Sequence, residues 1–446
     1  MTFDESSSAG RGDSVGGLPA LRRWLGPGFR ALKHRNYRLF FAGQGMSLVG
    51  TWMQRTALAW LVYDLTGEKV MLGIVGFIGQ ILTFLVAPFA GVLAEHTDRR
   101  KLLVLTQALA MIQALVLAGL VFTGTITTWQ IVLLSGLLGL VNGFDIPIRQ
   151  SFVVEMLDSR ADLPNAIAMN SLLVNASRLV GPSLAGLLIA AVGTGACFAI
   201  NGATFLAVIA ALLAMRTRPI ERLARNGSVL SNLREGIKYA YHFAPIRAIL
   251  LLLATISLVG SSHTVLLPVF AKDILHGGPR TLGFMMAAIG IGAVAGSIYL
   301  AMRPSVRGMG RIMAAGCAML GVSVIGFGLS RSLALSYCLL AVAGFGIMAQ
   351  FAGSNSLLQT LVDDDKRGRV MSLYVMAFMG MSPFGSLLAG WLADLIGAPT
   401  TVILGGSFCI LAGGLFATRL PILGRMAHPV YVRMGIATDP LDDARL

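Results

Sequence analysis

Ser47-Leu48-Val49-Gly50 recurs 210 positions later as Ser257-Leu258-Val259-Gly260. Gly67 and Gly73 align with Gly277 and Gly283 at the same offset. Toward the end of each copy the offset becomes 204, so that Gly181, Ala185-Gly186, Gly193 and Gly202 align with Gly385, Ala389-Gly390, Gly397 and Gly406. A register this constant predicts two related halves. Many membrane carriers are built from two such halves, with the substrate site between them.

The composition is that of a membrane protein. Of the 446 residues, 55% are hydrophobic and 13% are charged, and the mean hydropathy is +0.75; a soluble domain carries about 25% charged residues. A spanning helix needs roughly 20 apolar residues. Such stretches lie near 39–63, 71–94, 102–122, 129–150, 164–191, 196–215, 249–271, 281–302, 311–330, 333–357, 370–396 and 400–420. The sequence therefore predicts an all-α membrane protein with 12 transmembrane helices in two pseudo-symmetric six-helix bundles.

The net charge of +14 is distributed unevenly over this topology. On one side of the predicted membrane lie 29 of the 35 Lys and Arg residues. The opposite loops hold only Lys69, Lys272, Arg280 and Arg331. Because Lys and Arg gather in cytoplasmic loops, both termini are predicted to be cytoplasmic. The basic charge is then a topology signal, and no nucleic-acid partner is expected.

Five segments follow from this topology. Residues 1–38 form an N-terminal tail with a basic interfacial segment, and 39–215 form the first bundle. Residues 216–248 form a central cytoplasmic loop, in which apolar residues at helical spacing predict a short surface helix. Residues 249–420 form the second bundle, and 421–446 a cytoplasmic C-terminal tail.

Enzyme chemistry has no support in the sequence. The four cysteines fall inside predicted spans at spacings that suit neither disulfides nor a metal site. No phosphate-binding loop of the G-x-x-x-x-G-K-[ST] type occurs. No cofactor and no bound metal are expected.

Gly91-Val-Leu-Ala-Glu95-His-Thr-Asp98-Arg99-Arg100-Lys101 follows the second predicted span. It resembles the G-x-L-a-D-r-x-G-R-K signature of the major facilitator superfamily. Residues 139–152, with Asn142, Asp145 and Arg149, and residues 178–186, Arg-Leu-Val-Gly-Pro-Ser-Leu-Ala-Gly, narrow the match. They are similar to a bacterial branch that holds enterobactin exporters and macrolide-efflux proteins and is often labelled transmembrane secretion effectors. The similarity runs from about Phe29 to Leu420.

This resemblance implies a cytoplasmic latch. In the family the cluster holds the cytoplasmic ends of the two halves together, and Gly91, Glu95, Arg99, Arg100, Asp145 and Arg149 match its positions. The chain departs from the family at Glu95, where Asp is usual, and at Asp98, where Gly is usual, which puts the geometry of the latch in question. The alternative is that these basic residues only anchor the topology.

Asp145 and His263 are the candidates for proton coupling. Asp145 lies one turn from Arg149 near the cytoplasmic end of the fourth span, so the two can form an i,i+4 pair that supports the latch. The alternative is that Asp145 exchanges a proton during transport. His263 lies at membrane depth and titrates near neutral pH, but such a histidine is also often a hydrogen-bonded structural residue.

Arg178 precedes Gly181-Pro182 by one turn in the fifth span and needs a partner, water or an anionic ligand at that depth. Gly-Pro bends a helix, and the motif partly matches the G-P-x-x-G-G signature of antiporters. A packing role and a role in the substrate path remain equal alternatives for Arg178. Gln54 and Arg55 on the first span are further cavity candidates. The remaining cavity candidates are neutral side chains, which can equally join helices: Asn142, Gln350, Asn355 and Tyr374.

The sequence thus predicts a secondary active transporter, a proton-coupled exporter of a drug, siderophore or other small amphipathic molecule that works by alternating access. We expect it to be a monomer in the bacterial inner membrane, with a small-molecule substrate, protons and the lipid bilayer as its partners. An importer or facilitator on the same fold is the first alternative. A non-transporting membrane scaffold or sensor is the second, and charged residues within spans such as Arg55 argue against it.

Overall fold

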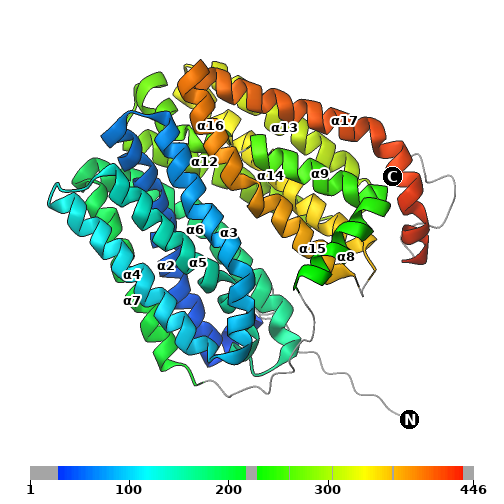
Figure 1. Ribbon diagram of the computed structural model, residues 1–446, viewed down its shortest axis with the longest axis horizontal. Helices are drawn as coiled ribbons and strands as arrows, with labels where there is room; N and C mark the ends of the chain where they lie inside the picture. Colours follow the sequence, from blue (N-terminus) through cyan, green and yellow to red (C-terminus); the bar gives the residue numbers. More distant parts are fainter. Residues whose placement is uncertain (1–28, 217–228, 261, 304, 364–365, 435–446) are drawn as a thin grey trace, which may run out of the picture.

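The computed structural model describes residues 29–216, 229–260, 262–303, 305–363 and 366–434. Within these ranges the chain is almost entirely helical, and long helices pack side by side (Figure 1). The predicted all-α membrane fold is confirmed. Eleven helical stretches in the described part are long and apolar enough to cross a membrane. The polar α2 is not among them, but its 32 residues run alongside α6 and α7, which is compatible with twelve spans.

The first group of helices follows a short 3-10 turn at Arg30–Lys33, and two further 3-10 turns, Val153–Met156 and Arg160–Asp162, separate α5 from α6. Its helices are α2 (Arg35–Thr66), α3 (Lys69–His96), α4 (Arg99–Phe122), α5 (Thr128–Phe152), α6 (Leu163–Val192) and α7 (Thr194–Ala214).

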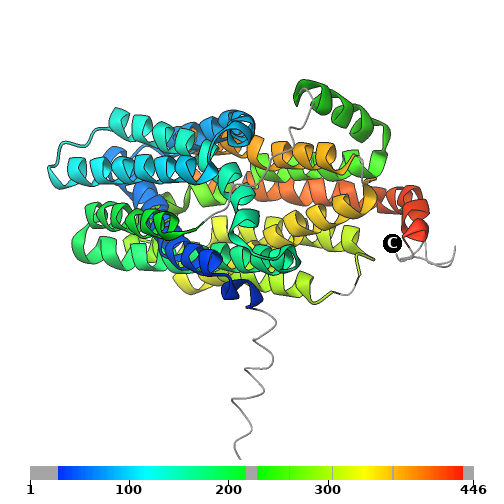
Figure 2. The same cartoon turned by 90° about the horizontal axis from the view of Figure 1, so that it is seen from below.

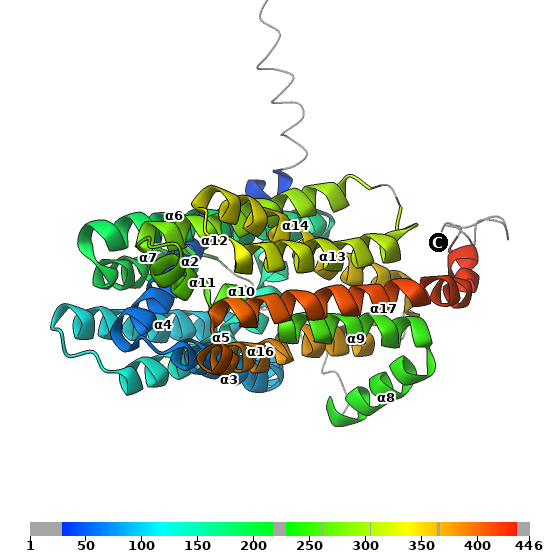
Figure 3. The same cartoon turned by 90° about the horizontal axis from the view of Figure 1, so that it is seen from above.

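The second group follows the short helix α8 (Val229–His242), which lies at the edge of the molecule beside α9 (Figures 2 and 3). Its members are α9 (Ala244–Val259), α10 (Ser262–Val265), α11 (Leu267–Val269), a π-helical turn at Phe270–Ile274, α12 (Pro279–Ala301), α13 (Met309–Leu329), α14 (Leu333–Leu361), α15 (Arg367–Val375), a second π-helical turn at Met376–Gly380, α16 (Ser382–Ile396) and α17 (Ala398–Arg433). The helix predicted in the central loop is thus present as α8.

Local sequence sets several helix ends. Gly67 ends α2 with a φ of 68°, a left-handed conformation that glycine adopts without steric cost. The side chain of Asp98 accepts hydrogen bonds from the backbone N–H groups of Arg100 and Lys101 and so caps α4. The departure from the family pattern at Asp98 therefore has a structural reason: this residue starts the next helix.

The seventh and eleventh predicted spans are not continuous helices. Residues 249–271 divide into α9, α10 and α11, and residues 370–396 divide at the π-helical turn before α16. The break before α11 and the break before α16 lie next to a proline, Pro268 or Pro383, which has no N–H for the carbonyl one turn earlier. Both predicted spans are nevertheless present as membrane-length stretches, Ala244–Ile274 and Arg367–Ile396, with breaks inside them.

The last helix extends beyond the predicted end near 420 and reaches Arg433 despite Pro421 and Pro429. Phe416, Leu420, Leu423, Ala427 and Tyr431 recur every three or four residues and line one side of a pocket shared with α9, α13 and α14. This apolar stripe packs the added turns against the second group, so the helix continues past residue 420.

The two groups form a V in Figure 1: α3 and α16 lie close together at one end, and the helix pair α16–α15 diverges from α3 toward the other. We call the joined end, with the turns at Gly67, Gly193 and Gly397, the far end. The terminal end is where α2 begins and where α7 and α17 finish. Contacts between the groups are made mainly by α3 with α16 and by α6 with α12.

Candidate functional site

Two arginines share one indole ring about halfway along the helices. The guanidinium carbon of Arg55 lies 5.0 Å from the centroid of the Trp52 ring, and that of Arg178 lies 5.6 Å from it. Trp52 and Arg55 are one turn apart on α2, whereas Arg178 comes from α6. Both are cation–π contacts. The sequence predicted each arginine separately as a cavity candidate, and the structure brings them together.

This cluster lies where the two groups of helices face each other. Thr56, next to Arg55, contacts the sulfur of Met286 on α12 at 3.3 Å. On α6, the carbonyl oxygen of Arg178 approaches Gly290 of α12, where an added Cβ would lie 3.4 Å away. Arg55 is exposed and Arg178 is half-buried. Among the described residues, neither arginine has a hydrogen bond or an ion pair.

Gly181 and Pro182 shape the helix that carries Arg178. A Cβ on Gly181 would lie 2.5 Å from the Cβ of Trp52, so only glycine lets α6 pack this closely on α2. Pro182 lacks the N–H that would bond the carbonyl of Arg178, and both residues are buried. These two cavity candidates therefore set the helix geometry around the cluster.

At the far end, glycines let helices of the two groups touch backbone to backbone. A Cβ on Gly73 of α3 would lie 2.7 Å from the carbonyl oxygen of Ser386 on α16. A Cβ on Gly283 of α12 would lie 2.5 Å from the carbonyl oxygen of Pro182 on α6. Small residues at helix crossings are typical of membrane bundles. The two crossings occupy related positions, since Gly73 and Gly283 align in the internal repeat.

Polar contacts reinforce the same end. The carboxylate of Asp394 on α16 accepts hydrogen bonds from the backbone N–H groups of Lys69 (3.2 Å) and Val70 (2.9 Å), so it caps α3 from the opposite group. Lys272 donates to Asp64 at 2.6 Å, and the hydroxyl of Tyr63 donates to Asp273.

Sequence reasoning missed this far-end cluster. The sequence feature that could have indicated it is the small set of basic residues on the predicted non-cytoplasmic side: Lys69, Lys272, Arg280 and Arg331. Two of these four, Lys69 and Lys272, take part in the contacts between the groups. A basic residue that departs from the positive-inside pattern and has an acid nearby in the sequence is thus a useful sign of a contact between halves.

Asp145 is held inside the first group. Its carboxylate is 4% exposed and accepts hydrogen bonds from Thr106 (2.9 Å) and Gln107 (2.7 Å) of α4. Arg149 pairs with it at 3.4 Å, one turn along α5. The predicted i,i+4 pair is present, and the two partners on α4 had no sequence signal.

Arg99 pairs at 2.8 Å with Glu155, which lies in the short 3-10 turn after α5. Arg100 donates to the backbone carbonyl of Leu213 at the end of α7. In this structure the two arginines of the predicted latch thus hold parts of the first group together. The surroundings of Gly91 and the side chain of Glu95 lie outside what the structure describes.

His263 is fully buried at the break in the seventh span. Its Nδ1 lies 2.8 Å from the carbonyl oxygen of Gly260, to which it can only donate, and its Nε2 lies 3.3 Å from the hydroxyl of Thr264. Both ring nitrogens are therefore satisfied when the imidazole is neutral. Such an arrangement favours the structural role that the sequence left open.

The neutral candidates differ in their surroundings. Gln54 is 2% exposed and bonds both Gln113 and Asn201, so it joins α2 to α4 and α7 inside the first group. Gln350 is buried and bonds Ser354. Asn142, Asn355 and Tyr374 are half-buried. Among the described residues, no group of three or more His, Cys, Asp or Glu could hold a metal ion.

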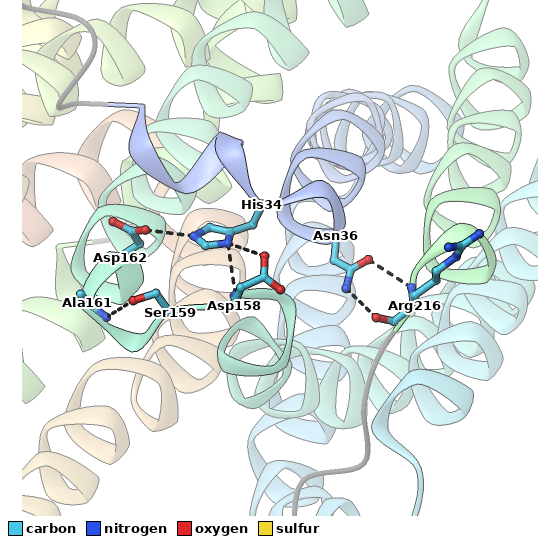
Figure 4. Close-up of polar contacts among 7 residues, drawn as sticks. All are labelled: His34, Asn36, Asp158, Ser159, Ala161, Asp162 and Arg216. Atoms are coloured by element: carbon cyan, nitrogen blue, oxygen red, sulfur yellow. Dashed lines mark hydrogen bonds and ion pairs between the residues drawn. The ribbon is translucent and has the colours of Figure 1, made fainter.

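His34 joins the segment before α2 to the connection between α5 and α6 (Figure 4). Its Nδ1 lies 2.8 Å from Asp158, and its Nε2 lies 3.0 Å from Asp162. Burial lowers the pKa of His34, but the hydrogen bonds and charges of the two carboxylates raise it by more, so its pKa lies above the usual 6.5. Nearby, Asn36 exchanges two hydrogen bonds with the backbone of Arg216, which fixes the same end of α2 (Figure 4).

The His34 contact should make stability depend on pH. Because the pKa of His34 is raised in the folded state, its contribution is complete below pH 6.5 and is lost as the pH rises through the folded-state pKa. Asp158 is largely exposed, so we expect a contribution of about 1 kcal/mol or less. The difference between the melting temperatures at pH 6 and pH 8.5 should be smaller in His34→Gln than in the parent. An equal pH dependence in both proteins would contradict this role.

Known proteins resemble the chain over most of its length. The family model described as transmembrane secretion effector matches residues 27–429. The staphyloferrin A transporter of Staphylococcus aureus is 24% identical, over 86% of this chain and 96% of that protein. The multidrug efflux pump Tap of Mycolicibacterium fortuitum is 26% identical, over 86% and 93%. Macrolide efflux protein A of Streptococcus pyogenes is 22% identical, over 85% and 95%.

Solved structures support the fold. A bacterial homologue of the iron transporter ferroportin, in an inward-facing state, matches with a TM-score of 0.65 at 18% identity, over 86% of this chain and 98% of that one. The nucleoside transporter NupG matches with a TM-score of 0.68 at 13% identity, over 87% and 98%. The chain therefore belongs to the transmembrane secretion effector family of major facilitator superfamily transporters.

Proposed function

We propose that this protein is a proton-coupled exporter of a small molecule that works by alternating access. The observation that carries this proposal is the V-shaped arrangement, in which glycine crossings and polar contacts join the groups at the far end while the helices diverge toward the terminal end (Figure 1). Export as the direction is supported by relatives whose names describe efflux.

The terminal end would face the cytoplasm of a bacterial inner membrane, because it carries most of the Lys and Arg residues. The structure would then represent the inward-facing state, closed toward the outside. Opening the far end would separate α3 from α16 and α6 from α12 together. It would also remove Asp394 from the N-terminus of α3, so the closed form is stabilised by a cap that the open form lacks.

The latch would act in the outward-facing state. Arg99 and Asp145 bind partners of their own group here, and closing the terminal end would bring this region against the second group. Glu95 and Gly91 would contribute according to the family pattern. The monomer would suffice for this cycle, because both groups belong to one chain.

Proton coupling is assigned to Asp145, with His263 as the alternative. Asp145 is a buried acid with three partners, so neutralising it would weaken its bond to Arg149 and free that arginine to move. His263 would have to accept a proton in a fully buried position whose two nitrogens are already occupied.

The test uses purified protein in proteoliposomes with an imposed pH gradient and an internal pH dye. Compounds added in turn are staphyloferrin A, a macrolide and a lipophilic cation. We expect substrate-dependent proton flux in the parent, its loss in Asp145→Asn, and its retention in the control Glu68→Gln, an exposed acid at the far end. Loss in His263→Gln with retention in Asp145→Asn would move coupling to the histidine. No flux with any compound from folded protein would contradict proton coupling.

A further inference from the structure

Midway along the spanning helices lie two arginines that have no acidic partner among the described residues. The acids of these helices lie toward the ends: Asp64, Asp273 and Asp394 near the far end, and Glu95 and Asp145 nearer the terminal end. Arg55 and Arg178 lie between these levels, and both lie against the ring of Trp52. Within the described part of the chain they make no hydrogen bond and no ion pair. A charge at this depth is costly unless it meets water, a partner or a ligand.

The geometry of the pair adds a second argument. With distances of 5.0 and 5.6 Å to one ring centroid, the two guanidinium carbons lie no more than about 11 Å apart. Like charges this close repel each other where solvent screening is incomplete. An anion between or beside them would remove that repulsion and gain attraction from both.

The pair lies beside the second group. Thr56 and the backbone of Arg178 both touch α12, so the surface near them lies against the second group. Arg55 is exposed there although its neighbours Gln54 and Thr56 are buried. An exposed arginine beside the second group can meet a solute that enters between the two groups.

We propose that Arg55 and Arg178 form a binding site for an anionic substrate, one that carries carboxylate groups, with the indole of Trp52 as the apolar wall beside them. This deepens the proposed transport function by naming the chemical class of its substrate. The guanidinium group has a planar set of donors that fits a carboxylate in a bidentate manner. A dicarboxylate or tricarboxylate engages both arginines, while a lipophilic cation is repelled by them.

The test measures binding to the full-length protein in lipid nanodiscs, without a pH gradient. Tryptophan fluorescence is followed during titration with citrate as the tricarboxylate probe, at constant ionic strength, and separately with tetraphenylphosphonium as the cation probe. The variants are Arg55→Gln, Arg178→Gln, the double variant, and the charge-retaining Arg178→Lys. Arg160→Gln, an exposed arginine on the 3-10 turn before α6, controls for non-specific attraction.

We expect citrate to cause a saturable change in the parent and in Arg160→Gln, with an apparent Kd at least about tenfold higher in each single glutamine variant. The apparent Kd of Arg178→Lys for citrate should lie between those of the parent and Arg178→Gln, because lysine keeps the charge and loses the planar donors. Tetraphenylphosphonium should bind about tenfold more tightly to the double variant than to the parent. Melting curves identify any variant that is unfolded. If a glutamine variant is unfolded, citrate binding by Arg178→Lys is compared with that of the parent instead.

The proposal is overturned if the parent shows no saturable response to citrate, or if the glutamine variants respond as the parent does. Tighter binding of the cation to the parent than to the double variant would also overturn it. Since binding is measured without a gradient, carboxylate binding without proton flux would contradict only the coupling, and flux without this binding would contradict only the site.

Discussion

Gly73→Leu is expected to abolish transport while leaving the protein folded. The Cβ at this position would already lie 2.7 Å from a backbone oxygen of Ser386, and a leucine side chain is larger still. Overpacking of this kind costs about 1–3 kcal/mol, which lowers the ratio of the far-end-closed form to the far-end-open form about 5- to 150-fold. Substrate-dependent proton flux in proteoliposomes should fall accordingly.

Gly119→Leu is the matched control for this variant. Gly119 is an exposed glycine within α4, and an added Cβ there meets nothing within 4 Å. Gly119→Leu makes the same change in side-chain size and helix propensity at a position where no other helix packs closely. Equal transport by Gly73→Leu and Gly119→Leu would show that the α3–α16 crossing does not have to close.

Gly292→Leu is expected to prevent the protein from folding, and not only to stop transport. A Cβ on Gly292 of α12 would lie 1.7 Å from the carbonyl oxygen of Ala341 on α14, and a Cβ on Gly344 would lie 2.1 Å from the carbonyl oxygen of Ile289. This reciprocal crossing lies inside the second group, which moves as a unit in the proposed cycle. The clash therefore persists in every state, and we expect a destabilisation of about 3 kcal/mol or more.

The readout for Gly292→Leu is the yield of monodisperse protein on size-exclusion chromatography and its melting temperature. Gly414→Leu on α17 is the control, because no atom lies within 4 Å of an added Cβ there. A parent-like melting temperature for Gly292→Leu would mean that α12 and α14 can separate without loss of the fold.

The internal repeat and the hydropathy pattern were sufficient to predict the fold, because both depend on spacing along the chain. The hydropathy pattern does not predict the helix breaks before α11 and before α16, although Pro268 and Pro383 lie beside them. Within an apolar stretch a proline either kinks a helix or ends it, and packing of neighbouring helices decides which.

The candidate site shows a sharper limit. Arg55 and Arg178 were recognised as costly charges, but they are far apart in sequence and only the packing of α6 on α2 at Gly181 brings both to Trp52. Adjacency in the sequence predicts that Gln54 and Arg55 share the cavity. On a helix adjacent residues point about 100° apart, so Gln54 joins helices of the first group while Arg55 remains exposed.

The account is tested most directly by measuring two distances at once with pairs of spin labels in nanodiscs. One pair joins far-end loops of the two groups, at Thr125 and Ser332, and the other joins terminal-end positions, at Ser159 and Met302, all exposed. In Gly73→Leu relative to the parent, we expect the far-end distance to lengthen and the terminal-end distance to shorten. If both distances stay unchanged or shift in the same direction, the two groups do not alternate and the proposed mechanism is wrong.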